Sequence, residues 1–202
     1  MIKLKSLLTA LFIAVAFVTT SGHAAVATAL TGKTVTFTVT ASGTTPFTYQ
    51  WKKAGTNISG IAATSNPYII GAVTLADAGD YTVSVTNSAG STLSDTGTLT
   101  VYALPVFTTQ PVNVSTTIGG SASFTVVVTG SPAPTLQWQK GGVNIAGATS
   151  ATYSIASAVS GDAGSYTVVA TNAGGVVTSA AATLTVNAVA PTLNPITITV
   201  SP

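Results

Sequence analysis

The chain of 202 residues contains no cysteine, no arginine and no glutamate, and only 5% of its residues are charged. The absence of cysteine excludes a disulfide framework, a catalytic thiol and every thiolate metal site. The single histidine, His23, lies close to the N-terminus, in a segment that we expect to be removed. Catalytic arrangements built on a histidine base then lose their only candidate. The sequence therefore predicts that the protein is not an enzyme and needs no cofactor.

Residues 1–24 have the three parts of a secretory signal peptide. Two lysines come first, an apolar run from Leu7 to Val18 follows, and small residues lead to Ala24, which is the usual order of charge, hydrophobic core and cleavage site. The alternative is an uncleaved membrane anchor, but a spanning helix needs ~20 apolar residues and this run is shorter. We predict cleavage after Ala24, with Ala27 as the second choice. A secreted or cell-surface protein without membrane insertion after cleavage follows.

The predicted cleavage also changes the charge balance. Six lysines and four aspartates give the whole chain a net charge of +2. Lys3 and Lys5 leave with the signal peptide, so four lysines and four aspartates remain and the net charge is zero. A neutral chain offers no basic face for nucleic acid or anionic lipid, and we expect no nucleic-acid partner.

The rest of the sequence repeats itself at a period of 85 to 87 residues, which indicates two tandem domains. The stretch LADAGDYTVSVTN at 75–87 returns as SGDAGSYTVVATN at 160–172, and TYQWKKAGTNI at 48–58 returns as TLQWQKGGVNI at 135–145. Apolar and hydroxyl residues alternate in VTFTV at 35–39, a pattern typical of a strand with one buried face. Threonine and valine favour such strands, and the many glycines suit the turns between them.

Four landmarks in each unit resemble those of an immunoglobulin domain of the intermediate set. In that family a strand-B cysteine precedes a buried strand-C tryptophan by about a dozen residues, and an Asp-x-Gly-x-Tyr-x-Cys motif marks strand F. The resemblance implies structural roles, with valine at the cysteine positions, for Val39, Trp51, Asp77, Gly79, Tyr81 and Val83 in the first unit and for Val126, Trp138, Asp162, Gly164, Tyr166 and Val168 in the second. Cysteine-free members of this kind indicate a bacterial source.

The predicted fold is all-β, with two tandem immunoglobulin-like antiparallel β-sandwiches after a signal peptide. We expect the first domain at residues 25–102 and the second at 103–187. Residues 188–202 contain two prolines followed by the alternating ITITV, much like the start of the second unit. They are predicted to be a linker or the start of a truncated third domain.

The four aspartates are the remaining candidates for chemistry, and none is assigned a catalytic or metal-binding role. Asp77 and Asp162 belong to the two tyrosine motifs, one in each domain, so a glycosidase-like carboxylate pair is not expected. Asp80 and Asp95 are predicted to be solvated surface residues. A calcium site at Asp77 and Asp80 has too few oxygen ligands without help from carbonyls.

These observations predict a non-catalytic exported module that serves as a cell-surface spacer or as an adhesion and interaction module, within a longer array of such domains. The alternative is a carbohydrate-binding accessory module, in which exposed aromatic rings stack on sugars. Only Phe47, Tyr49 and Tyr102 are left for that task once the motif residues are assigned to cores, and packing is the favoured role for the first two. The expected partner is a protein or glycan surface ligand.

Overall fold

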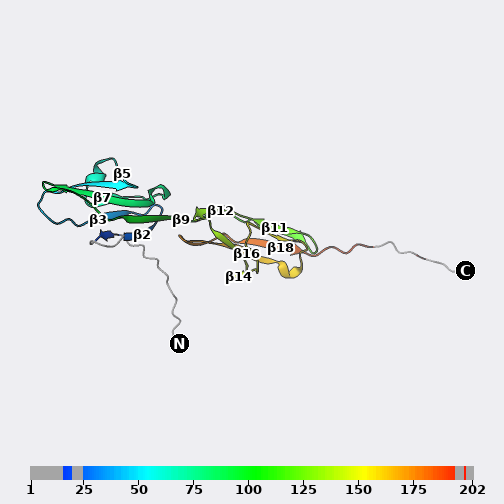
Figure 1. The fold of residues 1–202 in the computed structure, drawn as a ribbon. Coiled ribbons are helices and arrows are strands. Elements are labelled where there is room, and N and C mark those ends of the chain that lie inside the picture. The colour runs from blue at the N-terminus through cyan, green and yellow to red at the C-terminus, as the bar shows by residue number, and fades with distance from the viewer. Residues whose placement is uncertain (1–15, 20–24, 194–197, 199–202) are drawn as a thin grey trace, which may run out of the picture. The chain divides into compact units, whose positions relative to one another are not determined.

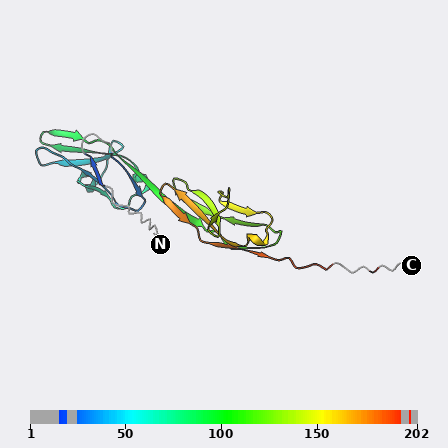
Figure 2. The same cartoon turned by 90° about the horizontal axis from the view of Figure 1, so that it is seen from below.

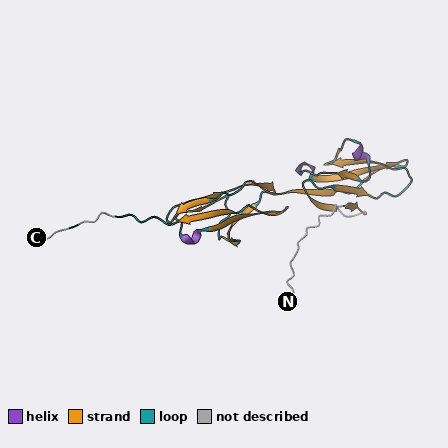
Figure 3. Ribbon diagram, turned by 180° about the vertical axis from the view of Figure 1, so that it is seen from behind, coloured by secondary structure: helices purple, strands orange, loops and turns teal. Residues whose placement is uncertain are grey.

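The computed structural model of the protein describes residues 16–19, 25–193 and 198 (Figure 1). The chain divides into two compact units, residues 1–104 and 105–202. Within each unit the strands form two layers, as the two views in Figures 1 and 2 show. The helical elements that the structure describes are three short 3-10 turns (Figure 3).

The first unit consists of two facing sheets. One sheet has the order β9-β7-β4-β5, with β2 paired to β9 and β8 paired to β7, and the other has the order β1-β3-β6. The elements are β1 (Ala16–Thr19), β2 (Ala25–Leu30), β3 (Val35–Val39), β4 (Thr48–Lys53), β5 (Thr56–Asn57), η1 (Ile61–Thr64), β6 (Tyr68–Ile70), η2 (Leu75–Asp77), β7 (Gly79–Asn87), β8 (Gly90–Leu93) and the start of β9 (Gly97–Thr109).

The second unit repeats this plan. One sheet has the order β10-β18-β16-β13-β14, with β17 paired to β16, while β11 pairs with β15 and β12 with β9 on the other side. The elements are the end of β9, β10 (Val114–Thr117), β11 (Ala122–Thr125), β12 (Val127–Ser131), β13 (Thr135–Lys140), β14 (Val143–Asn144), β15 (Thr152–Ile155), η3 (Ser160–Asp162), β16 (Gly164–Asn172), β17 (Gly175–Thr178) and β18 (Ala182–Asn187).

Strand register explains why the two sequence repeats fold alike. Trp51 lies opposite Val83 in the antiparallel pair β4–β7, and Trp138 lies opposite Val168 in β13–β16. Because side chains alternate across a strand, this register turns each tryptophan and its valine partner toward the interior. Each unit also has one parallel pair, β2 with β9 and β10 with β18.

Tight hairpins join β7 to β8 and β16 to β17, as the turn residues predict. Asn87 pairs with Gly90 and Asn172 with Gly175 at the hairpin ends. Gly90 and Gly175 have φ of 141° and 149°, a backbone region that glycine adopts without steric cost. The glycines at these positions therefore set the reversal of the chain.

The predicted all-β fold with two tandem immunoglobulin-like sandwiches is confirmed. The predicted signal peptide lies largely outside the described residues, with one exception. Ala16–Thr19, within residues 1–24, forms β1 and pairs in parallel with β3, Thr19 lying opposite Val39. The predicted cleavage and domain boundaries stay predictions.

Candidate functional site

Each domain has an aromatic cluster at its centre, built from four rings on facing strands. In the second domain Phe124 lies with its ring centroid 4.8 Å from that of Tyr166 and 6.0 Å from that of Trp138, and Tyr153 completes the group. Trp138 has no exposed surface. Phe37, Trp51, Tyr68 and Tyr81 repeat the cluster in the first domain.

The polar atoms of the tryptophans are satisfied inside these cores. The Trp51 Nε1–H donates to the carbonyl of Ser65 at 2.8 Å, and the Trp138 Nε1–H donates to the carbonyl of Ser150 at 2.9 Å. In the part of the chain that the structure describes, no buried side-chain nitrogen or oxygen lacks a hydrogen bond. Since an unpaired buried polar group is costly, both tryptophans serve the cores without penalty.

The tyrosine motif forms the same corner in both domains. The Tyr81 hydroxyl donates to the carbonyl of Asp77, and the Tyr166 hydroxyl donates to the carbonyl of Asp162, both at 2.7 Å. Desolvation by burial raises the pKa of Tyr166 to about 12, with smaller contributions from its neighbours, and burial together with Asp77 also raises the pKa of Tyr81. Both rings are therefore held neutral at physiological pH and act as structural anchors.

The carboxylates of the motif bind backbone donors at the preceding 3-10 turn. Asp77 Oδ2 accepts from both the backbone N–H and the hydroxyl of Thr74 at 2.7 Å, and Asp162 Oδ2 accepts from the backbone N–H of Val159 at 2.8 Å. No arginine exists to pair with them. Instead Lys53 donates to the carbonyl of Ala76, and its Nζ lies 5.9 Å from the centre of the Tyr81 ring.

A lysine at the matching place in the second domain makes the same contacts. Lys140 donates to the carbonyl of Gly161 and lies 5.9 Å from the Tyr166 ring. Its Cε is also 3.3 Å from a Cβ built on Gly164, a residue with φ of 148°. The same contact joins Lys53 to Gly79, so glycine leaves room for the lysine stem in each domain.

The valines at the expected cysteine positions differ between the two domains. Val83, Val126 and Val168 are fully buried, whereas Val39 is only half-buried. The side-chain amide of Asn66 brackets Val39, accepting from its N–H at 3.1 Å and donating to its carbonyl at 2.7 Å. The first domain is therefore more open than the second at this point.

The other carboxylates do not assemble into a site. Asp80 is exposed and accepts from Thr98 Oγ1 at 2.7 Å, and Asp95 is exposed beside β9. Among the residues that the structure describes, no group of three or more His, Cys, Asp or Glu side chains could hold a metal ion. Tyr49 packs against the first core and Tyr102 is half-buried, so neither forms an open platform for a sugar.

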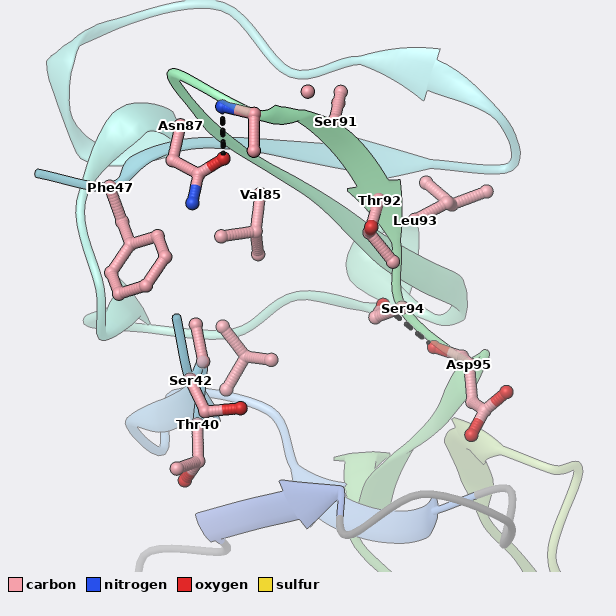
Figure 4. A pocket seen from close by; sticks show the side chains of 14 residues that line it. Thr40, Ser42, Phe47, Val85, Asn87, Ser91, Thr92, Leu93, Ser94 and Asp95 are labelled. Carbon is pink, nitrogen blue, oxygen red and sulfur yellow. Dashed lines mark hydrogen bonds between the residues drawn. The ribbon is translucent and has the colours of Figure 1, made fainter. Parts of the chain in front are cut away.

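A pocket of about 590 Å³ opens in the first domain, between the residues after β3 and the hairpin β7–β8 with its exit toward β9 (Figure 4). Val85 lies inside it, Phe47 closes one side, and Leu93 to Asp95 form the opposite rim. Its lining mixes apolar and hydroxyl side chains and includes the half-buried Val39. Sequence reasoning missed this pocket. The signal for it is that the strand that begins the second domain, around Pro105, has no counterpart in the first except within the predicted signal peptide.

The fold and the two motif cores define a tandem immunoglobulin-like protein. The immunoglobulin I-set domain model matches residues 17–101 and 105–186, and the chain belongs to this family. The first match begins before the predicted cleavage site. No helix in the part of the chain covered by the structure has the length and apolar character needed to cross a membrane.

Similar proteins fall into two groups. The chain is 40% identical over 95 residues to endoglucanase C of Cellulomonas fimi, covering 45% of this chain and 9% of the enzyme. It is 34% identical over 148 residues to Roundabout homolog 1 of Mus musculus, covering 69% of this chain and 9% of that protein. The chain thus spans about a tenth of these relatives.

Among solved structures, extracellular domains 3–5 of Drosophila OTK align with a TM-score of 0.63 at 24% identity, over 80% of this chain and 59% of that one. At this identity the likeness shows the fold alone. The chain as a whole resembles the immunoglobulin-like modules of cell-surface and adhesion proteins.

Proposed function

We propose that the protein is an exported, non-catalytic bacterial module that acts as a cell-surface spacer or interaction module, and that further immunoglobulin-like domains belong to the same array. One observation carries the proposal. The tryptophans and motif tyrosines are committed to two self-contained cores, and the motif carboxylates cap backbone turns. The side chains most suited to chemistry or ligand stacking are thereby used for stability.

Export is part of the proposal and rests on the order of charge, apolar run and small residues in 1–24. The alignment with the extracellular domains of Drosophila OTK supports this location by analogy of fold. A cysteine-free core also suits a domain that folds after export, because its folding needs no oxidant.

Cell fractionation tests this proposal. An antibody against residues 25–187 is used on medium, surface, periplasmic and cytoplasmic fractions of the native organism. We expect a band in the surface or medium fraction, shortened relative to a variant whose apolar run is interrupted by Leu11→Lys. A full-length band confined to the cytoplasm would contradict export.

A carbohydrate-binding accessory role is the second candidate, supported by the similarity to endoglucanase C. Phe47 is the aromatic residue at the pocket, so it is the residue on which a sugar ring would stack. Calorimetric titration with soluble cello-oligosaccharides tests this. Saturable binding that Phe47→Ala removes and Val143→Ala retains, the latter at an exposed site of the second domain, supports the accessory role. Absence of binding in the unmodified chain would remove it.

A further inference from the structure

The second domain shows what normally closes the place where the first domain has its pocket. Pro105, in β9, has its Cα 3.3 Å from a Cβ built on Gly130, and Thr108 Oγ1 donates to the carbonyl of Val127 at 3.3 Å. As the chain advances along β9, its partner recedes along β12, so the two strands pair in antiparallel fashion. Phe107, between these contacts, packs against the core.

The first domain has no such strand at the matching position. Residues 40–44, which correspond to β12, form no strand although all of them are described. β1 pairs only as far as Val39 and runs parallel to β3, opposite in direction to the pair in the second domain. The edge beyond Val39 therefore stays uncovered at the pocket.

Burial confirms that the pocket is the place of a missing strand. Val39 and Val85 line the pocket and are half-buried. Their counterparts in the second domain, Val126 and Ala170, are fully buried, with exposed fractions of 1% and 0%. The same two positions are thus closed in one domain and open in the other.

We propose that this pocket is an acceptor slot for a β-strand, and that its occupant is the segment of residues 188–193 from a second copy of the chain. Addition of a strand to an open edge uses backbone hydrogen bonds for affinity and pockets for alternate side chains for specificity. The inference goes beyond the proposed function and does not depend on export.

The segment after β18 has the pattern of the strand that fills the slot of the second domain. Leu193 follows Pro191 by two residues, just as Phe107 follows Pro105. Leu193 is 96% exposed, so a large apolar side chain is available with no partner strand. Burying it in the slot contributes the free energy that Phe107 contributes in the second domain.

Reach favours a second copy over closure within the chain. In the second domain, β16 runs from Gly164, opposite Leu184 near the chain exit, to Asn172, which binds the carbonyl of Pro132 at the chain entry. Nine strand residues cover about 30 Å, while the six residues 188–193 span at most ~20 Å. The segment cannot return to the entry of its own domain.

Such a contact joins the end of one copy to the start of the next. A contact between two different surfaces of identical chains repeats without closing and produces linear assemblies. A strand of six residues buries less than the ~1,200 Å² of standard interfaces, so each link is expected to be weak and concentration-dependent.

Cysteine cross-linking tests the proposal in a chain that has no cysteine of its own. The register of β9 and β12 places Phe107 opposite Val128, whose counterpart is Ala41, so Ala41→Cys and Leu193→Cys are expected to meet. The two single variants are mixed, oxidised and run on a non-reducing gel. A bound strand raises the local thiol concentration to the millimolar range, so we expect heterodimer on the order of tenfold above background.

The control mixture pairs Ala41→Cys with Val143→Cys, at a site 71% exposed in the second domain. Heterodimer yields that do not differ between the two mixtures overturn the proposal. The double variant Ala41→Cys with Leu193→Cys is expected to form a ladder of multimers. Conversion into a linked monomer only would overturn the second copy as the occupant.

Sedimentation velocity on the chain without cysteines gives an independent reading. The mean mass is expected to rise with concentration and to stay at the monomer value in Leu193→Asp. That side chain lies in solvent, so its replacement leaves the domains folded. A monomer at all concentrations, or assembly that Leu193→Asp does not change, refutes the proposal.

Discussion

Replacement of Trp138 by alanine tests the role of the aromatic cores, and the structure supplies the magnitude. Trp138 has no exposed surface, its Nε1–H donates to the Ser150 carbonyl, and its ring contacts those of Phe124 and Tyr153. Truncation of a buried tryptophan costs ~3–5 kcal/mol through lost burial and cavity formation. Domains of this size are stable by ~5–15 kcal/mol, so the loss is a large share of the total.

The chain has two tryptophans, one in each domain, which gives the assay a built-in control. In Trp138→Ala the remaining fluorescence comes from Trp51 and reports the first domain, while far-UV circular dichroism reports both. We expect urea titration to show a dichroism transition at much lower denaturant and a Trp51 fluorescence midpoint that does not move. In Trp51→Ala the fluorescence of Trp138 then reports the unchanged second domain.

Two results would refute this reasoning. An unchanged dichroism curve in Trp138→Ala would mean that the tryptophan does not carry the core. A parallel fall of the Trp51 midpoint would mean that the two cores are not independent. Trp138→Phe separates volume from hydrogen bonding, because it keeps a ring in the core but removes the Nε1–H donor.

Three further predictions concern the second domain. The raised pKa of Tyr166, about 12, means that its neutral form stabilises the fold below pH ~10, and that this contribution is lost as the pH rises through about 12; absorbance at 295 nm should show a late-titrating tyrosine that disappears in Tyr166→Phe. Val126→Cys combined with Val168→Cys should oxidise to a disulfide and raise the free energy of unfolding by ~2–4 kcal/mol, measured against the reduced form; failure to oxidise would contradict the positions assigned by resemblance. Asp162→Ala should lower the free energy of unfolding by ~1 kcal/mol, since the Val159 N–H loses its acceptor, and a neutral effect in urea titration would argue against the cap.

The sequence alone identified both domains because their signals are local. Trp51 follows Val39 by twelve residues and Trp138 follows Val126 by the same number, and alternation in short strands fixes which side chains point inward. The tyrosine motif places hydroxyl and acceptor four residues apart, so its corner closes within one turn of chain. Such features depend on spacing within a segment, and spacing is written in the sequence.

Only the tertiary structure decided how each domain is closed. Val39 and Val126 occupy equivalent places in the repeat and look alike in the sequence, yet one is half-buried and the other buried. The difference comes from a strand around Pro105 that covers one edge and has no antiparallel partner strand in the other domain. Likewise, the role of Lys53 beneath Tyr81 depends on two segments that are far apart in the chain. Burial is a property of everything that surrounds a side chain, and pairing between distant strands determines it.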